Sequence, residues 1–358
     1  MSQQTKIFVF HLLNDRSGSP KVLSQILKHW VKQKRDIHLY TTKNKNGFLS
    51  ETEGVKFYDG WYVFQSNPWL RLLYFTLSQM ILIFRMWNKI EKNDIVYINT
   101  VLPFGAAILG KCKGARIIYH IHESTVNPKI LKWFLLKIVK TTANDIINVS
   151  RFVQQSHNIS SLPNHLVYNA IENSYVENIL PKIPSQSPKN VLMVCSLKKY
   201  KGIYEFLQLA KDHPQFLFRL VMNASIFEIN SFFKEDKIPS NLTLYASQKN
   251  LHPFYQWADV IVNLSRPNEW IETFGLTIIE GMAYGLPAIV PPVGGILEVI
   301  ENGVTGVAVD SRDREKLSQT LVNILSDNDT YTMMSQSAKT RLNMFSEEKM
   351  TSAIDVII

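Results

Sequence analysis

The sequence predicts an α/β protein with two domains of similar size, each a parallel sheet covered by helices. The first observation is length, because 358 residues at roughly 100–200 residues per domain correspond to two domains. The second is composition, with 46% apolar and 19% charged residues, which is ordinary globular usage and enough for a core in each half. The third is the alternation of short β-prone runs with helical stretches, an order that produces parallel strands joined by helices.

The first half opens with a buried-strand pattern over residues 7–13, followed by a polar loop over 14–19. A helix follows with Pro20 in its first turn, and Ser19 is a suitable N-cap for it. Its apolar residues recur with helical spacing and predict one buried face: Val22, Leu23, Ile26, Leu27, Trp30 and Val31. Further strands are expected at 37–41, 94–98, 115–120 and 145–149.

A proline-rich stretch over 180–189 contains Pro181, Pro184 and Pro188 and reads as an interdomain linker. It predicts an N-terminal domain of residues 1–181 and a C-terminal domain of residues 182–345. The second half then repeats the alternation, with strands expected at 190–195, 216–222, 241–245, 258–263 and 286–290. Two such domains are expected to face each other across a cleft at the carboxyl ends of their strands, where open α/β sheets bind ligands.

Charge and cysteine content limit the partners and the compartment. The chain has 39 Lys and Arg against 30 Asp and Glu, a net charge of +9, which favours an anionic partner. Cys112 and Cys195 have no metal-ligand spacing, so we expect no disulfide framework, no zinc site and a reducing compartment. No export signal is visible in residues 1–6, and a cytoplasmic location follows as an expectation.

The most apolar segment, residues 69–87, does not predict a membrane span. Arg71 and Arg85 bracket only the 13 residues between them, fewer than the roughly 20 that a helix needs to cross a bilayer. We therefore expect a helix of the core here.

The segment 266–287 carries the strongest functional pattern. A strand ends near Asn263, a polar loop follows, and a helix is expected from about Gly275 to Ala283. The free N–H groups at the start of such a helix favour an anion, and Glu272 and Glu280 lie just before and one turn inside it. Two carboxylates beside a phosphate site suit a diphosphate ligand with sugars at both ends. The alternative is that Glu272 is an ordinary helix-start acid and Glu280 a solvated side chain.

Glu272 and Glu280, with seven residues between them in ETFGLTIIEGMAYGLP, resemble the signature of glycosyltransferase family 4. The similarity continues through residues 293–298 and 301–306 and, more loosely, along nearly the whole chain. The resemblance implies a GT-B fold, two Rossmann-like domains, and a C-terminal helix over 346–358 that packs back on the N-terminal domain. It implies retaining, metal-independent transfer without a cofactor. It assigns donor-sugar hydroxyls to Glu272, the nucleotide ribose to Glu280, and the diphosphate to the backbone amides of Phe274, Gly275 and Leu276.

A lysine cluster follows the first strand of the second half, at residues 198–201. Flexible ammonium groups at a strand end suit phosphate oxygens, although a solvated helix start is the alternative. Lys201 and Gly202 match a Lys-Gly pair of the family, which assigns Lys201 to the diphosphate. Ser196 stands where the family usually has an arginine, and Lys198 is the favoured substitute for that charge.

Two segments of the first half also match family positions. In YHIHE, His120 and His122 point the same way on a strand, but no further ligand cluster supports a metal. His122 matches a histidine at the cleft and is assigned to sugar contacts, while His120 is expected in the core. The loop around Gly18 resembles a glycine loop of the family that retains only its second glycine, and a backbone of this kind can approach a phosphate closely.

Two further patterns have competing explanations. Asp327 and Asp329 form a D-x-D sequence, a metal-binding motif in other glycosyltransferases, but they fall between helical stretches where aspartate is an ordinary cap. Lys129, Lys132, Lys137 and Lys140 share one helical face with Trp133 and Leu136. That face resembles a surface for an anionic membrane, or is simply a solvated lysine face.

The expected function is transfer of a sugar from a UDP- or GDP-sugar to a glycan or lipid-linked acceptor, in bacterial-type envelope or capsular polysaccharide synthesis. The catalytic residues would be Glu272, Lys201 and His122. A nucleotide-sugar epimerase or phosphorylase of the same fold is the first alternative. A basic nucleic-acid-binding protein is the second, disfavoured because the basic residues are scattered and not gathered in one stripe with aromatics.

Overall fold

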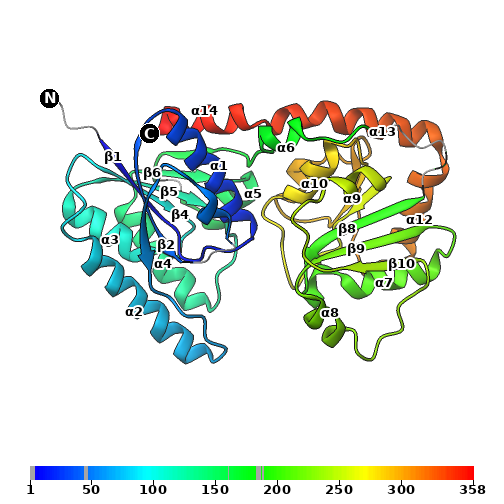
Figure 1. Cartoon of the computed structure of the whole chain (residues 1–358), viewed down its shortest axis with the longest axis horizontal. Coiled ribbons are helices and arrows are strands. Elements are labelled where there is room, and N and C mark those ends of the chain that lie inside the picture. The colour runs from blue at the N-terminus through cyan, green and yellow to red at the C-terminus, as the bar shows by residue number, and fades with distance from the viewer. Residues whose placement is uncertain (1–4, 44–46, 160, 183–186, 188) are drawn as a thin grey trace. The chain divides into compact units, whose positions relative to one another are not determined.

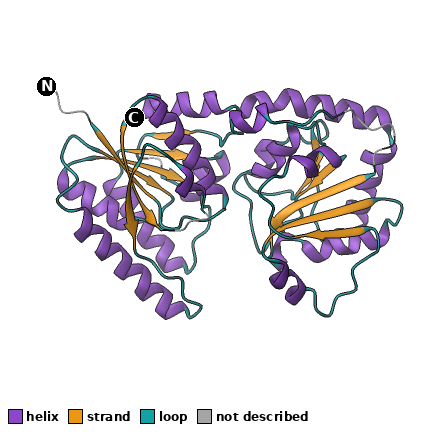
Figure 2. Cartoon of the chain, in the orientation of Figure 1, coloured by secondary structure: helices purple, strands orange, loops and turns teal. Residues whose placement is uncertain are grey.

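The protein, seen here in a computed structural model, folds into two compact units, each built on one parallel sheet (Figures 1 and 2). The structure describes residues 5–43, 47–159, 161–182, 187 and 189–358. Unit 1 comprises Met1–Asn169 and Glu348–Ile358, and unit 2 comprises Ala170–Glu347. The predicted fold class, two Rossmann-like α/β domains, is confirmed.

Unit 1 contains a seven-stranded sheet in the order β3-β2-β1-β4-β5-β6-β7, and every neighbouring pair is parallel. Its strands are β1 Lys6–Phe10, β2 Asp36–Thr42, β3 Lys56–Gly60, β4 Ile95–Asn99, β5 Arg116–Ile121, β6 Asp145–Asn148 and β7 Asn164–Leu166. Its helices are α1 Gly18–Lys32, η1 Phe48–Glu51, α2 Pro68–Met86, α3 Phe104–Lys113, α4 Lys129–Thr142 and α5 Arg151–His157, together with nearly all of α14, Glu347–Ile357.

Unit 2 contains a six-stranded parallel sheet in the order β10-β9-β8-β11-β12-β13. Its strands are β8 Asn190–Ser196, β9 Leu217–Asn223, β10 Leu242–Tyr245, β11 Val260–Val262, β12 Ala288–Val290 and β13 Gly306–Ala308. Its helices are α6 Asn173–Glu177, η2 Lys199–Lys201, α7 Ile203–Asp212, α8 Ile226–Phe232, α9 His252–Trp257, α10 Leu276–Met282, α11 Ile296–Val299, α12 Arg314–Ser326, α13 Asn328–Arg341 and η3 Leu342–Phe345.

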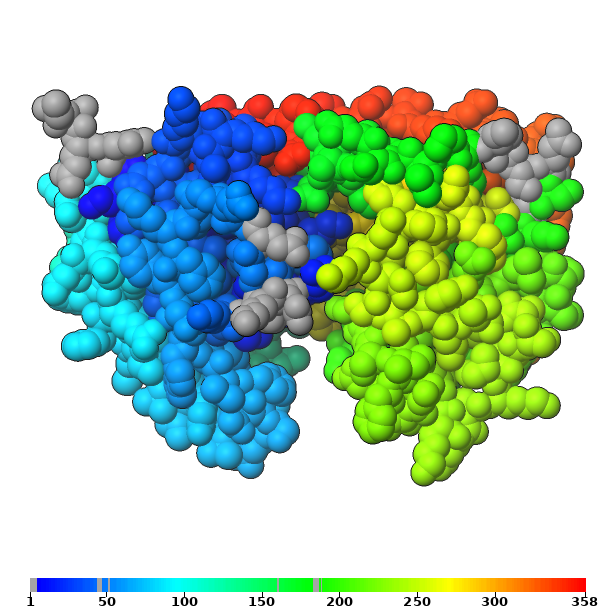
Figure 3. Space-filling model, viewed as in Figure 1, coloured from blue at the N-terminus to red at the C-terminus, as the bar shows by residue number. Residues whose placement is uncertain are grey.

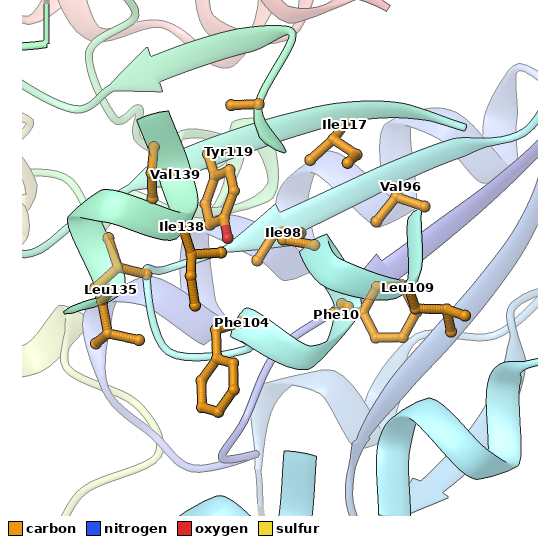
Figure 4. Close-up of a cluster of buried hydrophobic side chains, with 14 of the residues drawn as sticks. Phe10, Val96, Ile98, Phe104, Leu109, Ile117, Tyr119, Leu135, Ile138 and Val139 are labelled. Carbon is orange, nitrogen blue, oxygen red and sulfur yellow. The ribbon is translucent and has the colours of Figure 1, made fainter. Parts of the chain in front are cut away.

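Burial on both faces explains why the central strands read as continuous apolar runs. Every residue of β4 is buried, as expected for a parallel strand covered by helices on both sides. Figure 4 shows part of this core, where side chains of β4 and β5 such as Ile98 and Tyr119 meet Phe104 of α3 and Leu135 of α4. The expected strands form within one to three residues of their predicted ends, whereas the short or edge strands β3, β7 and β13 were not predicted.

Each sheet has one point where the strand order reverses, between β1 and β4 in unit 1 and between β8 and β11 in unit 2. Loops that leave the carboxyl ends of strands at such a point diverge, and ligands of open α/β sheets bind there. Of the sequence segments singled out above, the loop around Gly18 follows β1, the Lys201 cluster follows β8 and the Glu272 loop follows β11, while His122 follows the adjacent strand β5. The fold therefore brings them to the ligand-binding edge of their own sheet.

The predicted domain boundary after residue 181 is wrong by about a dozen residues, because the units divide between Asn169 and Ala170. Residues 170–182 are tied to unit 2 by side chains that composition does not reveal. The ring of Tyr175 stacks on His252 at 4.1 Å, and the Leu180 N–H donates to Tyr284 Oη over 3.1 Å. Within the predicted linker, residues 183–186 and 188 lie outside the described residues.

The terminal helix predicted over 346–358 forms as α14, and Glu348–Ile358 group with unit 1. Asp355 makes the principal polar contact of this helix. Its carboxylate accepts hydrogen bonds from His29 Nε2 over 2.7 Å and from Trp30 Nε1 over 3.3 Å, both on α1. Arg35 adds an ion pair at 3.3 Å.

The prediction that residues 69–87 form a core helix is wrong. Only one side of α2 is buried, through Phe75, Leu82 and Met86 among others, while Trp69 is 81% and Phe84 87% exposed. Apolarity alone does not distinguish a helix buried all round from one with a second, exposed apolar face. In the described part of the chain, no helix combines the length and apolarity needed to cross a membrane.

The helix after β1 begins two residues earlier than its predicted cap implies. Ser17, and not Ser19, is the N-cap of α1, and its side chain makes no capping hydrogen bond. Ser17 Oγ instead bonds the carboxylate of Asp15 at 2.5 Å.

Candidate functional site

Lys201 is positioned by a tight turn at the carboxyl end of β8. The strand ends at Ser196, and residues 199–201 form the single turn η2. Gly202 follows in the left-handed region, with φ +79°, and a Cβ there would overlap the carbonyl oxygen of Leu264. Glycine is therefore required for both its conformation and its close approach to the loop after β11.

Lys201 forms an ion pair with Glu272 at the edge of the unit 2 sheet. Lys201 Nζ lies 2.6 Å from Glu272 Oε1, and both side chains are mostly buried, 14% and 17% exposed. The same oxygen accepts hydrogen bonds from Ser265 Oγ over 2.7 Å and Asn263 Nδ2 over 3.3 Å. Residues 71 positions apart in the chain are thus joined in one polar cluster.

The charge state of Glu272 follows from these contacts. Burial by itself would raise the pKa of its carboxyl, but the Lys201 ammonium and the hydrogen bonds from Lys201, Ser265 and Asn263 outweigh burial and lower that pKa below its ordinary value. Glu272 is therefore a carboxylate at neutral pH, and it can accept hydrogen bonds from hydroxyl groups.

Two aromatic rings flank the ion pair. Tyr200 and Trp270 stack with ring centroids 5.1 Å apart, and Lys201 Nζ lies 4.9 Å from the centre of the Trp270 ring. Arg266 holds the intervening loop, since its N–H donates to Tyr200 O over 2.8 Å and its side chain pairs with Glu205 at 2.7 Å. Both rings therefore lie within 6 Å of the Lys201 ammonium, whose distance from the centre of the Tyr200 ring is 5.9 Å.

The backbone between the two glutamates is held by close packing. The side chain of Phe274 is buried and packs against Phe345 with centroids 5.7 Å apart, so only its backbone is available to a ligand. A Cβ on Gly275 would lie 2.9 Å from Ile296, and one on Gly294 would overlap the carbonyl oxygen of Glu272. Helix α10 begins at Leu276. The Ile278 N–H donates to the carbonyl of the N-cap Gly275 over 3.0 Å. The N–H groups at the helix start that have no intrahelical carbonyl are therefore those of Leu276 and Thr277.

Glu280 is not the solvated side chain of the alternative interpretation, because it is 5% exposed. Tyr255 Oη donates a hydrogen bond to Glu280 Oε2 over 2.7 Å. Burial, and then the neighbouring Glu280 charge, raise the pKa of Tyr255, which keeps the phenol protonated as a donor.

The other predicted residues of this segment lie apart from the ion pair. Lys198 and Lys199 are exposed, and the Lys198 charge contributes to lowering the pKa of Glu228, after hydrogen bonds from Ser225. Ser196 ends β8 and is half-buried. Of the lysine cluster, the structure therefore brings Lys201 alone to Glu272.

In unit 1, the predicted His122 belongs to a buried cluster at the ends of β1, β4 and β5. His122 Nε2 donates to Asn99 Oδ1 over 2.9 Å. On the other side of the amide, Asn99 Nδ2 lies 3.1 Å from His11 Nδ1 and donates to Ser19 O over 3.3 Å. Asn99 thus links His122 with the loop around Gly18. Gly18 itself is exposed.

All three histidines of this cluster are neutral. Burial lowers the pKa of His11, lowers that of His122 well below its usual range, and lowers that of His120 to about 3. His120 is fully buried, as expected for a core residue, and its Nδ1 accepts a hydrogen bond from Tyr97 Oη over 2.7 Å. Neutral imidazoles can bind sugar hydroxyls but contribute no positive charge.

Glu123 follows His122, and sequence reasoning gave it no role. Burial raises the pKa of its carboxyl to about 7, against opposing backbone hydrogen bonds. Its Oε2 accepts from the N–H groups of Val101 and His122 over 3.4 and 3.3 Å. The adjoining Thr100 has φ +79°, a strained conformation for a β-branched residue that the surrounding contacts must maintain.

The candidate metal motif is a helix cap. Asp327 is the N-cap of α13, and its side chain accepts hydrogen bonds from the N–H groups of Asp329 and Thr330. Within the described residues, no group of three or more His, Cys, Asp or Glu is placed to hold a metal ion.

Two family models match the chain. The family model of glycosyl transferases group 1 matches residues 176–341, and the model of glycosyltransferase family 4 matches residues 16–174. A relative from Klebsiella pneumoniae, an uncharacterized 41.2 kDa protein in the cps region, is 25% identical over 268 residues, 68% of this chain and 72% of its own length.

N-acetyl-alpha-D-glucosaminyl L-malate synthase of Bacillus anthracis is 27% identical over 190 residues, and the match spans 48% of this chain and 46% of that relative. Among solved structures, HepE of Anabaena in complex with UDP and glucose has a TM-score of 0.78 at 17% identity and covers 99% of both chains. At that identity the likeness shows the fold, which is GT-B. The two family models together match nearly the whole chain, and the protein belongs to the group 1, family 4 glycosyltransferases.

Proposed function

We propose that this protein transfers a sugar, with retention of anomeric configuration and without a metal, from a UDP- or GDP-sugar to a hydroxyl group of a glycan or lipid-linked acceptor. The observation that carries the proposal is the 2.6 Å Lys201–Glu272 pair at the ligand-binding edge of the unit 2 sheet. The pair combines a fixed cation for a diphosphate with an ionised acceptor for sugar hydroxyls.

In this proposal each side chain has one task. The Lys201 ammonium has three donors and uses one on Glu272, which leaves donors for the oxygens of the leaving diphosphate. Glu272 binds hydroxyls of the donor sugar. The backbone of Phe274 to Leu276 contacts the diphosphate. Glu280 binds the ribose, and His122 binds a sugar hydroxyl. The residues that border the donor are Gly18, Ser196 and Lys198.

The chemistry requires no strongly basic side chain. The bond between the donor's anomeric carbon and the diphosphate oxygen breaks as the acceptor oxygen bonds that carbon on the same face. The departing phosphate oxygen takes the acceptor's proton. Catalysis then consists of positioning and of stabilising the negative charge that develops on the diphosphate, a role that fits Lys201.

The names of relatives support a role in envelope or capsular polysaccharide synthesis. The Klebsiella relative is a protein in the cps region, and the solved HepE structures contain UDP, with glucose or as UDP-glucose. We propose a bacterial-type polysaccharide pathway in the cytoplasm, at the inner face of the membrane, as the setting.

A donor screen with two matched variants tests the proposal. Nucleotide release from UDP- and GDP-sugars is measured in EDTA for wild type, Glu272→Gln and Glu269→Gln, the last an exposed glutamate paired with Arg266 at 3.1 Å. We expect release from one donor class, a loss of at least roughly 100-fold in Glu272→Gln, and little change in Glu269→Gln. NMR of the product should show the donor's anomeric configuration. Equal rates in both variants, an inverted product or loss of activity in EDTA would each refute part of the proposal.

A further inference from the structure

Helix α2 carries a second apolar stripe that faces solvent. The stripe repeats with the spacing i, i+4, i+8, i+11 and i+15, which is one side of an α-helix. Its members are Trp69, Leu73, Leu77, Met80 and Phe84, each 39–87% exposed. These residues lie opposite the buried side of α2, and on the face drawn in Figure 3 the α2 segment, in light blue, reaches the surface of unit 1.

Helix α4 extends this surface on the same side of the unit 1 sheet. Phe104 of α3 packs edge-to-face against Phe75 of α2 at 5.6 Å and against Phe134 of α4 at 5.3 Å, so α3 lies between the two helices. On α4, Ile130 and Trp133 are 74% and 62% exposed. Of the four α4 lysines, Lys132 turns inward and donates to Ser124 O over 2.7 Å, while the other three are exposed.

Net positive charge is concentrated here because acidic residues are few, whereas the 39 Lys and Arg themselves are spread along the chain. Residues 60–144 contain 11 Lys and Arg against three acids and thus carry +8 of the net +9. Of the acids, Asp94 is buried, Glu123 has a pKa of about 7, and Glu91 lies 3.7 Å from Lys6.

Several of these cations lie beside exposed aromatic rings. Lys113 Nζ is 4.5 Å from the centre of the Trp87 ring, Lys137 Nζ is 5.1 Å from that of Trp133, and the Arg71 guanidinium is 4.7 Å from that of Phe64. Trp with Lys or Arg at the border of an apolar face is the arrangement that anchors helices at a bilayer interface.

We propose that α2 and α4 form a docking surface for an anionic lipid bilayer, with the α2 stripe entering the interface and the lysines contacting headgroups. We define this docking face as the exposed side chains of residues 64–87 and 130–140. A second copy of the chain is disfavoured as the occupant, because a two-fold interface would bring the same positive surfaces together. Nucleic acid is disfavoured because the α2 stripe has no polar group to meet phosphates or bases.

The docking face would also place a membrane-held acceptor close to unit 1, and this step of the inference rests on the proposed lipid-linked acceptor. The inner side of α2 contributes Ser78, Gln79 and Leu82 to the lining of a water-sized cavity at the carboxyl ends of β1 to β3, which His11 also lines. One helix thus contacts lipid on its outer side and borders the candidate site on its inner side. An acceptor held in the bilayer would reach the enzyme at this helix.

Vesicle flotation with the full-length protein tests the docking face. We expect binding to vesicles of 60% phosphatidylcholine and 40% phosphatidylglycerol, weak binding to phosphatidylcholine alone, and release in high salt. Met80→Glu with Phe84→Glu should weaken binding at least roughly tenfold, and Lys137→Gln with Lys140→Gln roughly 30-fold, at about 1 kcal/mol per lysine. The matched control is Ile226→Glu with Phe227→Glu on α8, two exposed apolar residues of unit 2.

Three results would overturn the inference: no flotation with anionic vesicles at low salt, equal losses in the α2 and α8 variants, or a stable dimer or oligonucleotide complex that the α2 variant abolishes. The α2 variant should keep wild-type nucleotide release in the donor screen. Failure of docking with normal release refutes the membrane surface alone, whereas absent release with normal docking refutes the proposed transfer.

Discussion

At the residue scale, the pairing of Lys201 with Glu272 determines the properties of the candidate site. The ion pair is mostly shielded from water, so removing one partner leaves the other charge partly buried and costs stability. Glu272 keeps two further donors, Ser265 and Asn263, which hold its carboxylate when Lys201 turns toward a ligand. The Glu272 carboxylate therefore stays hydrogen-bonded when Lys201 moves, whereas removing Glu272 leaves the Lys201 charge without its partner.

Glu123 predicts a specific pH dependence of stability. Because burial raises the pKa of Glu123 to about 7, from about 4.3 in the unfolded chain, the folded state holds its proton more tightly. This contribution to stability is complete below pH 4.3 and is lost as pH rises through 7. Across that window it amounts to about 4 kcal/mol at most, at about 1.4 kcal/mol per unit.

The variant Glu123→Gln isolates this effect, since the amide stays neutral at every pH. Its Tm, measured by scanning fluorimetry between pH 5 and 8, should rise relative to wild type as pH increases and level off above 7. The neutral histidines contribute equally to both proteins and cancel in the difference. A difference in Tm that stays constant over this range would contradict the assigned burial of Glu123.

Some of the site residues could be predicted from sequence and others could not. Lys201, Glu272 and His122 follow strands at the sheet edge, and strand ends are visible as apolar runs. Asn99 also ends a strand, so the same rule could have identified it. The roles of Thr100 and Trp270 could not be foreseen, because a backbone strain and a ring stacked on Tyr200 depend on how loops pack.

At the element scale, the turn between β8 and α7 is the feature that places Lys201. Gly202 combines a positive φ of +79° with contact against Leu264. Gly303 has nearly the same φ, +82°, but among the described residues, its chain neighbours aside, no atom lies within 4 Å of where a Cβ would be. Replacing each glycine with alanine therefore separates two effects on stability, that of the left-handed backbone and that of steric overlap with the Leu264 loop.

Gly202→Ala should therefore destabilise the protein more than Gly303→Ala. In Gly303→Ala the only loss of stability comes from placing alanine in the left-handed conformation, about 1–2 kcal/mol. Gly202→Ala has the same loss and must also displace the Leu264 loop, which costs about 1–3 kcal/mol more. Tm values and nucleotide release report both effects, and Gly202→Ala should also reduce release by moving Lys201. Equal losses of Tm in the two variants would show that the loop contact contributes nothing.

The elements show where sequence patterns succeed and fail. Central parallel strands were predicted because burial on both faces makes them continuous apolar runs. The edge strand β3 is mostly exposed, so it lacks that signal. Helix α2 is apolar on both its buried and its exposed side, so its sequence resembles that of a fully buried helix. Only the exposure of Trp69 and Phe84 in the structure distinguishes α2 from such a helix.

At the scale of the whole molecule, charge and chemistry belong to different parts of the chain. Residues 60–144 hold +8 of the net +9, while the Lys201–Glu272 pair lies in unit 2. The net charge therefore says little about the donor site and much about the α2 and α4 surface. Length and composition predicted two units correctly, but the boundary depended on contacts of Tyr175 and Leu180 that no compositional change marks.

The central claim is that Lys201, beside Glu272, holds the diphosphate of a nucleotide. Isothermal titration calorimetry of UDP and GDP against wild type, Lys201→Ala and Lys199→Ala tests it most directly, with an oligonucleotide as the unrelated anion. Wild type should bind one of the two nucleotides. Lys201→Ala should bind that nucleotide at least roughly tenfold more weakly, and the affinity of Lys199→Ala, which replaces an exposed lysine, should lie within about twofold of wild type. The oligonucleotide should not bind. Equal affinity in wild type and a folded Lys201→Ala, or no binding of either nucleotide, would contradict the claim.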